Sequence, residues 1–415
     1  MPIAAAVLAL ALKTTIAFNT YGTNDVITWE RDLAKVEAGG ATALYREGIL
    51  YASANGVAYA SQAFIHPPFM LTALRAWAVL ARVSGLPLQF WLRFTSSVAD
   101  LISLLLVAKL LRRLARWNTA SFGLLAMALC PVSVVISGFH GNTDPVMIAF
   151  VLLSIYCIVS GRSAWAAGAA MGMALNIKIV PVIFIPAVLL YLPAMRERLR
   201  YIASLAAVFL LGSLPYLLQD PLLIAKTMLG YSSKSGLWGF SLFSVLSQDT
   251  RWFWLFRHYD AAGKVVVLAA ILCLSAAMNS RENKPPLFLQ CGAVAFLCLF
   301  LAPGFAMQYL AWLVPWVLAL GIGPTLFFYT VAGTFVVIVY NDWCGGFPWY
   351  LANVLTRPWE VRHAFLGLFC WAAVLAILAI YLNRLFAAQA SPAGNRESEG
   401  EPTLRLAQHA IASSK

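Results

Sequence analysis

Four clusters of polar residues lie where long apolar runs end, and each carries a side chain able to act on a substrate at a membrane surface. Ionisable residues at membrane depth are costly and tend to be retained for function. The first cluster is Thr23-Asn24-Asp25, just after the first apolar run. A carboxylate at Asp25 could accept a proton from a bound hydroxyl. The alternative is a helix cap for the segment that starts at Val26, because Asn and Asp are favoured N-caps.

The second cluster is the run Gly-Phe-His-Gly-Asn-Thr-Asp-Pro at 138–145. It offers His140, Asn142 and Asp144 as polar groups that could contact a substrate. Asp144 precedes Pro145, and this pair is also an ordinary helix start, so a capping role stays open.

The third cluster lies between two short apolar runs and contains Asn176 and Lys178. The ammonium group of Lys178 could pair with a phosphate, or the side chain could only extend to the membrane interface. Short, interrupted helical hairpins of this kind often line a cavity.

The fourth cluster begins another short run with Gln308 and Tyr309, followed by Trp312. The alternative for the two aromatic residues is an interfacial aromatic belt. Gln308 is less easily explained in that way.

Other polar groups do not form a recognisable centre. His66, His140, His258 and His363 all fall in segments assigned below to one side of the membrane, but no pair has metal-ligand spacing, so we predict no metal cofactor. Arg93 and Asp100, two helical turns apart, are interpreted as buried structural pairings with other helices.

The amino-acid composition indicates that the chain around these clusters is surrounded mostly by lipid. Of 415 residues, 61% are hydrophobic and only 11% are charged, and the mean hydropathy is +0.78. Ordinary soluble domains carry roughly a quarter charged residues, so a soluble enzyme is excluded. The net charge of +12 does not indicate a nucleic-acid partner, because the basic residues fall between apolar runs.

Apolar runs near the ~20 residues needed to cross a bilayer recur along the chain and predict an all-α, polytopic helical bundle. Short basic loops at 112–116, 162, 196–200 and 281–284 should be cytoplasmic. They share one side only if the segment from Pro67 to Ser84 is a re-entrant or interfacial helix. Both termini are then cytoplasmic, and the twelve expected spans are 2–18, 90–111, 119–138, 145–160, 164–177, 180–193, 201–218, 264–280, 286–302, 310–322, 324–340 and 364–384.

Three segments on the other side are too long to be simple connectors: 19–89, 219–263 and 341–363. The first predicts an amphipathic helix that breaks at Gly39-Gly40. Its apolar face would carry Trp29, Leu33 and Val36, and its polar face Glu30, Arg31, Asp32, Lys35 and Glu37. We interpret 1–384 as one transmembrane domain and 385–415 as a disordered cytoplasmic tail.

Taken in order, the clusters resemble motifs of the GT-C superfamily, integral-membrane glycosyltransferases that use polyprenyl-phosphate-linked sugars. The closest likeness is to the first mannosyltransferase of GPI-anchor assembly and its bacterial relatives. The run 138–144 resembles a Gly-Asn loop, Lys178 to Pro181 a Lys-X-X-Pro hairpin, and Gln308 to Trp312 a Gln-Tyr-X-X-Trp segment. His66-Pro67-Pro68 matches the end of that family's first external loop.

The resemblance implies a GT-C bundle with a helical first loop. It also implies transfer of a sugar, with mannose favoured, from a polyprenyl-phosphate donor to an acceptor hydroxyl, with inversion and Asp25 as general base. The GPI enzyme has Asp-X-Asp in this loop, whereas Asn24-Asp25-Val26 supplies one acid, which puts metal use in doubt. The substrate-binding residues are then Asn24, His66, His140, Asn142, Asp144, Lys178, Lys234, Gln308 and Tyr309. Lys234 and Arg251, both in the 219–263 segment, would help to stabilise the departing phosphate.

Other interpretations remain open from the sequence. A transporter or lipid flippase would also be a polytopic bundle, but it predicts paired interrupted helices and an ion path. A membrane scaffold would not need polar motifs on one face. The donor sugar and the acceptor, whether glycan, glycolipid or protein, are not specified, and the expected location is a bacterial cytoplasmic membrane with the active site facing outward.

Overall fold

The computed structural model describes residues 2–52, 58–114, 117–230, 238–239, 250–354, 357 and 359–386. The predicted tail after 386 and Lys234 lie outside the described residues, as does the side chain of Arg251.

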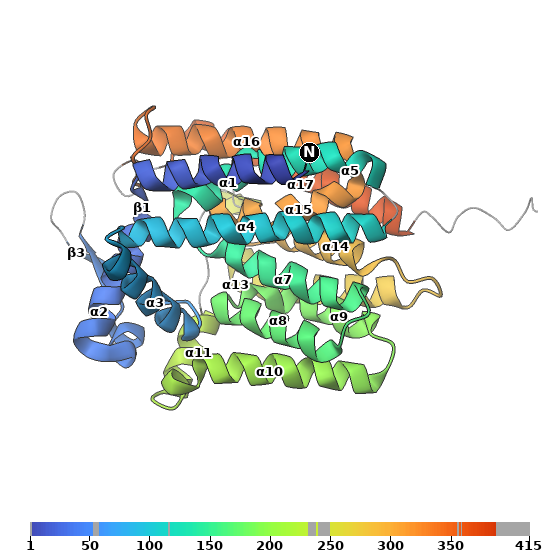
Figure 1. Cartoon of the computed structure of the whole chain (residues 1–415), viewed down its shortest axis with the longest axis horizontal. Helices are drawn as coiled ribbons and strands as arrows, with labels where there is room; N and C mark the ends of the chain where they lie inside the picture. Colours follow the sequence, from blue (N-terminus) through green and yellow to red (C-terminus); the bar gives the residue numbers. More distant parts are fainter. Residues whose placement is uncertain are drawn as a thin grey trace, which may run out of the picture.

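Helices lying side by side along one axis make up most of the molecule (Figure 1). Pro2 at the start of the first helix and Phe386 at the end of the last lie at the same end of this bundle. Its helices are α1 (Pro2–Asn19), α4 (Leu88–Arg113), α5 (Trp117–Ala128) with α6 (Pro131–Val135) and the π-helix η1 (Ile136–His140), α7 (Asp144–Val159), α8 (Ala164–Ile177), the 3-10 helix η2 (Val180–Phe184) with α9 (Ile185–Tyr191), α10 (Met195–Leu217), α13 (Thr250–Asn279), α14 (Leu287–Phe300), η3 (Met307–Trp312) with α15 (Val314–Val317) and η4 (Leu318–Leu320), α16 (Ile322–Cys344) and α17 (Val361–Phe386).

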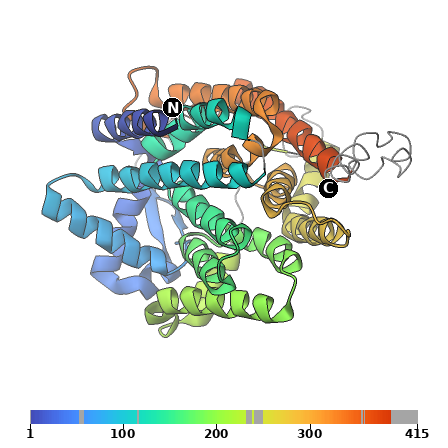
Figure 2. The ribbon, with the colours of Figure 1, turned by 45° about the vertical axis from the view of Figure 1, so that its right-hand side comes forward.

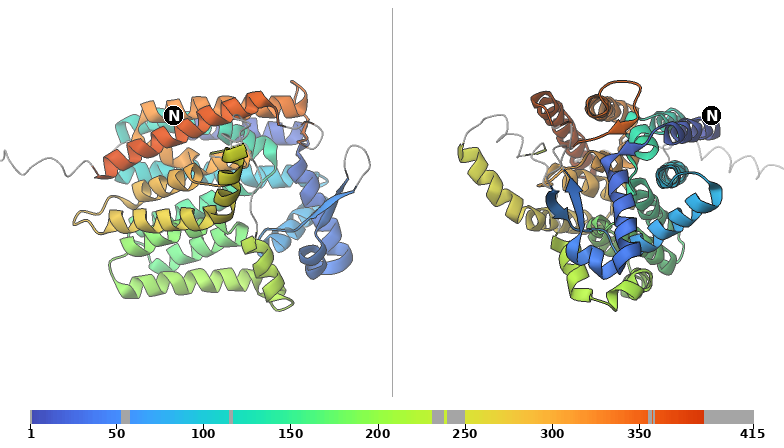
Figure 3. Two further views of the ribbon diagram at one scale, coloured as in Figure 1. Left: turned by 180° about the vertical axis from the view of Figure 1, so that it is seen from behind. Right: turned by 90° about the vertical axis from the view of Figure 1, so that its left-hand side faces the viewer.

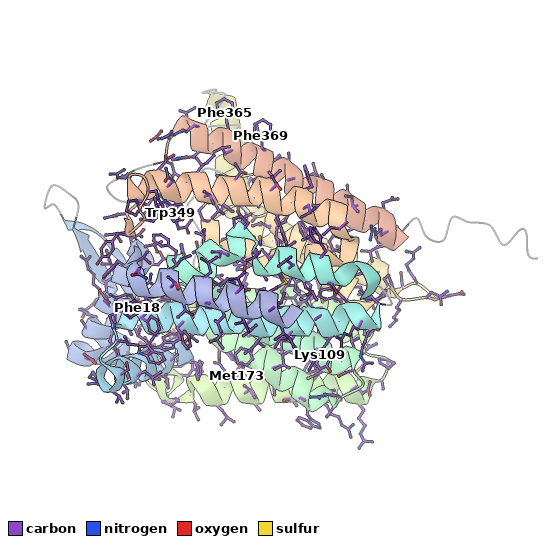
Figure 4. The ribbon with its side chains drawn as sticks, turned by 45° about the horizontal axis from the view of Figure 1, so that its top comes forward. Phe18, Lys109, Met173, Trp349, Phe365 and Phe369 are labelled. Atoms are coloured by element: carbon purple, nitrogen blue, oxygen red, sulfur yellow. The ribbon has the colours of Figure 1, made fainter. Side chains whose placement is uncertain are left out.

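The predicted helical bundle is confirmed, and each of the twelve expected spans falls on one of these helices or helical runs. Within the described residues, six helices are long and apolar enough to cross a membrane on their own. The remaining ones are shorter apolar helices. Large apolar side chains face outward, including Phe365 and Phe369 on α17, which point away from the bundle (Figure 4). A bundle with an apolar exterior is an integral membrane protein.

The first long segment forms a cap on the end of the bundle opposite to the start of α1 and the end of α17 (Figures 1 and 2). It contains α2 (Asn24–Glu47), the antiparallel pair β2 (Ile49–Ala52) and β3 (Ala58–Gln62), and α3 (Phe69–Ser84). Seen end-on, α2 and the hairpin lie across this end beside α11 (Pro221–Gly230) (Figure 3). As predicted, α3 is a helix of the cap that does not run the length of the bundle.

The amphipathic helix forms with one error in the predicted faces. Gly40 interrupts it with φ of 78°, as expected, and Trp29 and Val36 are buried. Asp32, predicted on the polar face, is buried as well, with 3% of its surface exposed. Residues 29, 32 and 36 follow helical spacing, so Asp32 belongs to the buried stripe.

Two short strands also depart from a purely helical expectation. β1 (Gly22–Thr23) pairs in parallel with β4 (Leu351–Ala352), with Gly22 opposite Leu351. Two residues are too few to give a periodic pattern. Their pairing joins the first long segment to the third directly before α2.

Close packing of α8 on α10 uses glycines. A Cβ at Gly168 would lie 2.2 Å from the Tyr201 carbonyl oxygen, so only glycine permits this approach. Asn176 donates to the Val208 carbonyl (3.0 Å) and accepts from Ser213 (3.1 Å). Asn176 therefore holds these two helices together and does not line the candidate site.

Buried charges fix α1 against α4. Lys13 pairs with Asp100, and its ammonium group also donates to Ser133 (2.7 Å). Arg93 donates to the carbonyls of Ala17 (2.8 Å) and Thr20 (2.7 Å), which are orphan acceptors at the end of α1. The structural role predicted for Arg93 and Asp100 is confirmed, and the exit of the chain toward α2 is held in place.

Candidate active site

A cavity of about 220 Å³ lies where the cap meets the bundle. Its walls come from α2, from 63–67 before α3, from the loop before α7, from the turn after α8 and from η3. Six of the predicted site residues line it: Asp25, His66, Asn142, Lys178, Gln308 and Tyr309. The fold thus brings all four sequence clusters to one place.

Asp25 does not cap its helix. The N-cap of α2 is Thr23, whose hydroxyl accepts from the Asp25 backbone amide (3.2 Å). The carboxylate is therefore free for other contacts, and its Oδ2 accepts from Nδ2 of Asn142 (3.0 Å) and lies 3.0 Å from Nε2 of His140. His140 Nδ1 in turn contacts the Tyr340 hydroxyl. About a third of the Asp25 side chain, 31%, is exposed.

These neighbours determine the ionisation of Asp25. Burial acts to raise the pKa of its carboxyl, but the charge and hydrogen bond of His140, the hydrogen bond from Asn142 and the charge of Lys178 outweigh burial and lower this pKa below its ordinary value. Asp25 is therefore a carboxylate at neutral pH. Because Oδ2 holds both partners, Oδ1 is left to accept a proton from a ligand.

Asp144 and Lys178 form a second charged pair directly behind the cavity wall. Asp144 is completely buried, at the first residue of α7, and accepts from Lys178 Nζ at 2.8 and 2.7 Å and from the Trp312 indole. Lys178 Nζ also lies 5.9 Å from the centre of the Tyr309 ring, which stacks on Trp312 at 4.1 Å. The ammonium group is held by α7 and η3 and reaches the cavity from the end of α8.

His66 lies in the same cavity against aromatic rings. Its ring centre is 4.6 Å from Trp29 and 5.5 Å from Phe64. Burial and the charge of Lys178 lower the pKa of His66 to about 3, although Asp25 and a backbone hydrogen bond act in the other direction. The imidazole is therefore neutral at physiological pH and serves as a hydrogen-bonding and stacking surface.

The loop at 138–145 approaches α2 closely. Gly141 has φ of 85°, and a Cβ there would lie 2.4 Å from Cγ2 of Val26. Thr23 donates its hydroxyl to the His140 carbonyl (2.7 Å), and Ser96 donates to the Asn142 carbonyl (2.5 Å). These contacts place His140 and Asn142 against Asp25.

Not every predicted residue reaches the cavity. Asn24 lies beside Asp25 but does not line it, and Lys234 lies outside the described residues. His140 and Asp144 do not line the cavity, but His140 contacts Asp25 and Asp144 pairs with Lys178. Two other histidines lie elsewhere: His258 contacts the Trp254 carbonyl (2.9 Å) and His363 contacts Asp342 (2.7 Å). In the described ranges no three His, Cys, Asp or Glu side chains converge as around a metal ion, and metal independence stays a prediction.

Sequence reasoning missed several cavity residues. Thr28, Trp29 and Asp32 line the cavity together with Asp25. They stand at i, i+3, i+4 and i+7 of one helix, so the spacing itself could have revealed this face. Tyr340, behind His140, has no comparable local signal, because it lies 200 residues further along the chain.

Fold and site together define an integral-membrane helical protein with a charged cavity at one end of its bundle. A model of the dolichyl-phosphate-mannose-protein mannosyltransferase family matches residues 66–218. The matched range contains His66, Asn142, Asp144 and Lys178. The resemblance drawn from the sequence motifs is thus confirmed by a comparison that does not use Asp25 or the η3 segment.

Two individual proteins share features with this chain. GPI mannosyltransferase 1 of Debaryomyces hansenii is 26% identical over 146 residues, 34% of this chain and 35% of that protein. The matched stretch thus spans about a third of this relative. The crystal structure of ArnT from Cupriavidus metallidurans bound to undecaprenyl phosphate superimposes with a TM-score of 0.50 and 16% identity, covering 92% of this chain and 71% of ArnT. This likeness establishes a shared fold.

Proposed function

We propose that the protein is a membrane glycosyltransferase that moves a sugar from a polyprenyl-phosphate donor to an acceptor hydroxyl. The observation that carries this proposal is that one cavity contains both a carboxylate and an ammonium group. The carboxylate of Asp25 accepts a hydrogen bond from Asn142, and the ammonium group of Lys178 is held by Asp144. The family match and the yeast relative favour mannose as the sugar. The ligand named for ArnT supports a polyprenyl phosphate as its carrier.

The reaction follows from these two groups. Asp25 accepts the proton of the acceptor hydroxyl while that oxygen forms a bond to C1 of the sugar. The bond from C1 to the phosphate oxygen breaks, and its electron pair remains on the phosphate. Lys178, with Asn142 nearby, stabilises the negative charge of the leaving phosphate. This single displacement at C1 inverts its configuration, and we expect it to proceed without a metal ion.

The orientation belongs to the same proposal. The cavity lies at the end of the bundle opposite to the basic loops at 112–113, 162, 196–200 and 281–284. The positive-inside rule assigns those loops and both termini to the cytoplasm. The site then faces outward from a bacterial cytoplasmic membrane, with a glycan, glycolipid or protein as the acceptor.

The test is sugar transfer in liposomes with radiolabelled polyprenyl-phosphate mannose and a lipid extract as acceptor. Wild type should transfer label, and folded Asp25→Asn should lose at least about 10³-fold in rate because the base is gone. Glu282→Gln, an exposed acid at the far end of the bundle, is the control and should keep full activity. Normal transfer by Asp25→Asn would refute Asp25 as the general base. No turnover by wild type with any polyprenyl-phosphate sugar would refute the proposed enzyme class.

A further inference from the structure

The cavity contains a second carboxyl group besides Asp25. Asp32 lines the same space with 3% of its surface exposed. It follows Asp25 by seven residues on α2, which places it two turns and about 10 Å further along the helix. Thr28 and Trp29 stand between them on the cavity face.

Asp32 lacks the partners that other aspartates have. No hydrogen bond or ion pair joins its carboxyl to any residue that the structure describes. Each of the five other aspartates with a described side chain has such a partner: Asp25, Asp100, Asp144, Asp220 and Asp342. Burial raises the pKa of Asp32 to about 7. A buried carboxyl without a partner weakens a fold, so a ligand that donates hydrogen bonds would satisfy it.

The surroundings of Asp32 indicate what kind of ligand fits. Trp29 and Phe64 provide aromatic surface in the same cavity, with ring centres 6.3 Å apart and His66 beside both. Aromatic surface suits the C–H face of a sugar ring, and a carboxylate suits its hydroxyls. An anionic phosphate would be repelled here and attracted instead to Lys178. The part of the cavity around Asp32 thus fits a neutral saccharide.

The position of Asp32 relative to Lys178 indicates whether this saccharide is the donor sugar or the acceptor. α2 lies across the end of the bundle (Figure 3), and the charge of Lys178 acts on Asp25 but not on Asp32, so Asp32 lies farther from Lys178 than Asp25 does. A lipid-linked donor must keep its tail with the bundle and its phosphate near Lys178. A displacement with inversion brings the acceptor to the face of C1 opposite the phosphate, which is the side of Asp25 that carries Asp32. A sugar ring about 5 Å across, with a hydrogen bond of about 2.8 Å at each edge, spans the distance from Asp25 to Asp32.

We propose that Asp32 and Trp29 form the acceptor subsite, in which the Asp32 carboxyl accepts hydrogen bonds from hydroxyls of a neutral acceptor sugar while Asp25 takes the proton of the reacting hydroxyl. This inference rests on the proposed function. It assigns Asp32 to acceptor binding and not to the donor or to the transfer step.

The kinetic test compares Asp32→Asn with Glu37→Gln, an exposed acid further along α2. With polyprenyl-phosphate mannose and dilutions of the lipid extract, Asp32→Asn should raise the apparent KM for acceptor by about 10- to 100-fold, the loss of one charged hydrogen bond. The KM for donor and the slow hydrolysis of donor by water should change less than twofold. An unchanged acceptor KM, or a parallel change in donor KM and hydrolysis, would overturn the assignment.

A second measurement does not depend on turnover. Carboxyl-specific labelling of the intact protein in detergent, read by mass spectrometry, should modify Asp32, and methyl α-mannoside should protect it while leaving Glu37 reactive. Labelling without protection, or no labelling of Asp32, would contradict the subsite. If wild type transfers no sugar from any donor while Asp32 is still protected, the proposed reaction fails and the saccharide subsite stands.

Discussion

The role of Asp25 depends on which residue caps α2. Asp25 could have been either a cap or a base, and the sequence left both open. Thr23 takes the cap, so the Asp25 carboxylate is free to contact His140 and Asn142. Similarly, Asp144 starts α7 but its carboxylate binds Lys178, and its capping role is not observed.

The hydrogen bond from Asn142 to Asp25 should affect the pH dependence of kcat/KM. Asn142→Ala removes one of the groups that lower the pKa of Asp25, so this pKa should rise. Protonated Asp25 cannot act as base, so the acid limb of kcat/KM should move to higher pH. Asn19→Ala, where the amide contacts only its own helix, is the control and should leave the limb in place. An unmoved acid limb in Asn142→Ala would argue against Asp25 as the titrating base.

The buried pair of Asp144 and Lys178 predicts that the loss of stability and the loss of activity can be separated by two substitutions. Lys178→Met leaves a fully buried carboxylate without its cation and should cost about 3–5 kcal/mol of unfolding free energy. Adding Asp144→Asn should recover most of that loss, because no charge is then left buried. Activity should stay lost in the double variant, since no cation faces the phosphate. Thermal unfolding in detergent and the transfer assay measure the two effects, and recovered transfer in the double variant would contradict a role for Lys178.

Single residues also show where sequence reasoning stops. Lys178, Asn142 and Gln308 were predicted because polar residues stand out against apolar runs. Asp32 was assigned to the polar face with its charged neighbours Glu30 and Arg31. Its burial depends on walls from 63–67 and from the bundle, which are set by tertiary contacts that no local pattern contains.

At the scale of elements, the helices were predictable because a long apolar run forms a membrane helix. The positions where these helices are interrupted were only partly predictable. Prolines at 131 and 315 interrupt apolar runs, and the structure has short helices with π or 3-10 turns there. Asn176 belongs to the same polar cluster of the sequence as Lys178. It bonds α10, a pairing determined by the glycine-based approach of two helices.

Close approach of the loop before α7 to α2 gives a prediction about Gly141. Gly141→Ala would place a Cβ 2.4 Å from Val26 and push the start of α2, with Asp25, away from His140. We expect at least a tenfold loss of kcat/KM in addition to some loss of stability. Gly161→Ala shares the positive φ (72°) but meets no atom within 4 Å, so it carries the backbone strain of about 1–2 kcal/mol without the displacement. Equal losses of kcat/KM in both variants would show that strain alone, and not displacement of Asp25, matters.

At the scale of the whole molecule, the bundle separates two kinds of charge. The described basic side chains of the short loops gather at the end where α1 starts and α17 ends, and the cavity with its charged pairs lies at the other end. The sequence predicted this division because loop charge and span parity are global properties of the chain. It did not predict the β1–β4 pairing, in which two residues from segments more than 300 positions apart meet.

The orientation can be measured with single cysteines in cells. Ala38→Cys on α2 and Asn283→Cys between α13 and α14 are both exposed and lie at opposite ends of the bundle. They are introduced into a background with Cys273→Ser and Cys344→Ser, because the other five cysteines are buried. A membrane-impermeant maleimide should label Ala38→Cys in intact spheroplasts and Asn283→Cys only after permeabilisation, since a bilayer separates the two ends. The reverse pattern would place the cavity in the cytoplasm, where the donor phosphate and the acceptor would have to be cytoplasmic too, and labelling of both positions in intact spheroplasts would contradict a bundle that spans the membrane along its long axis.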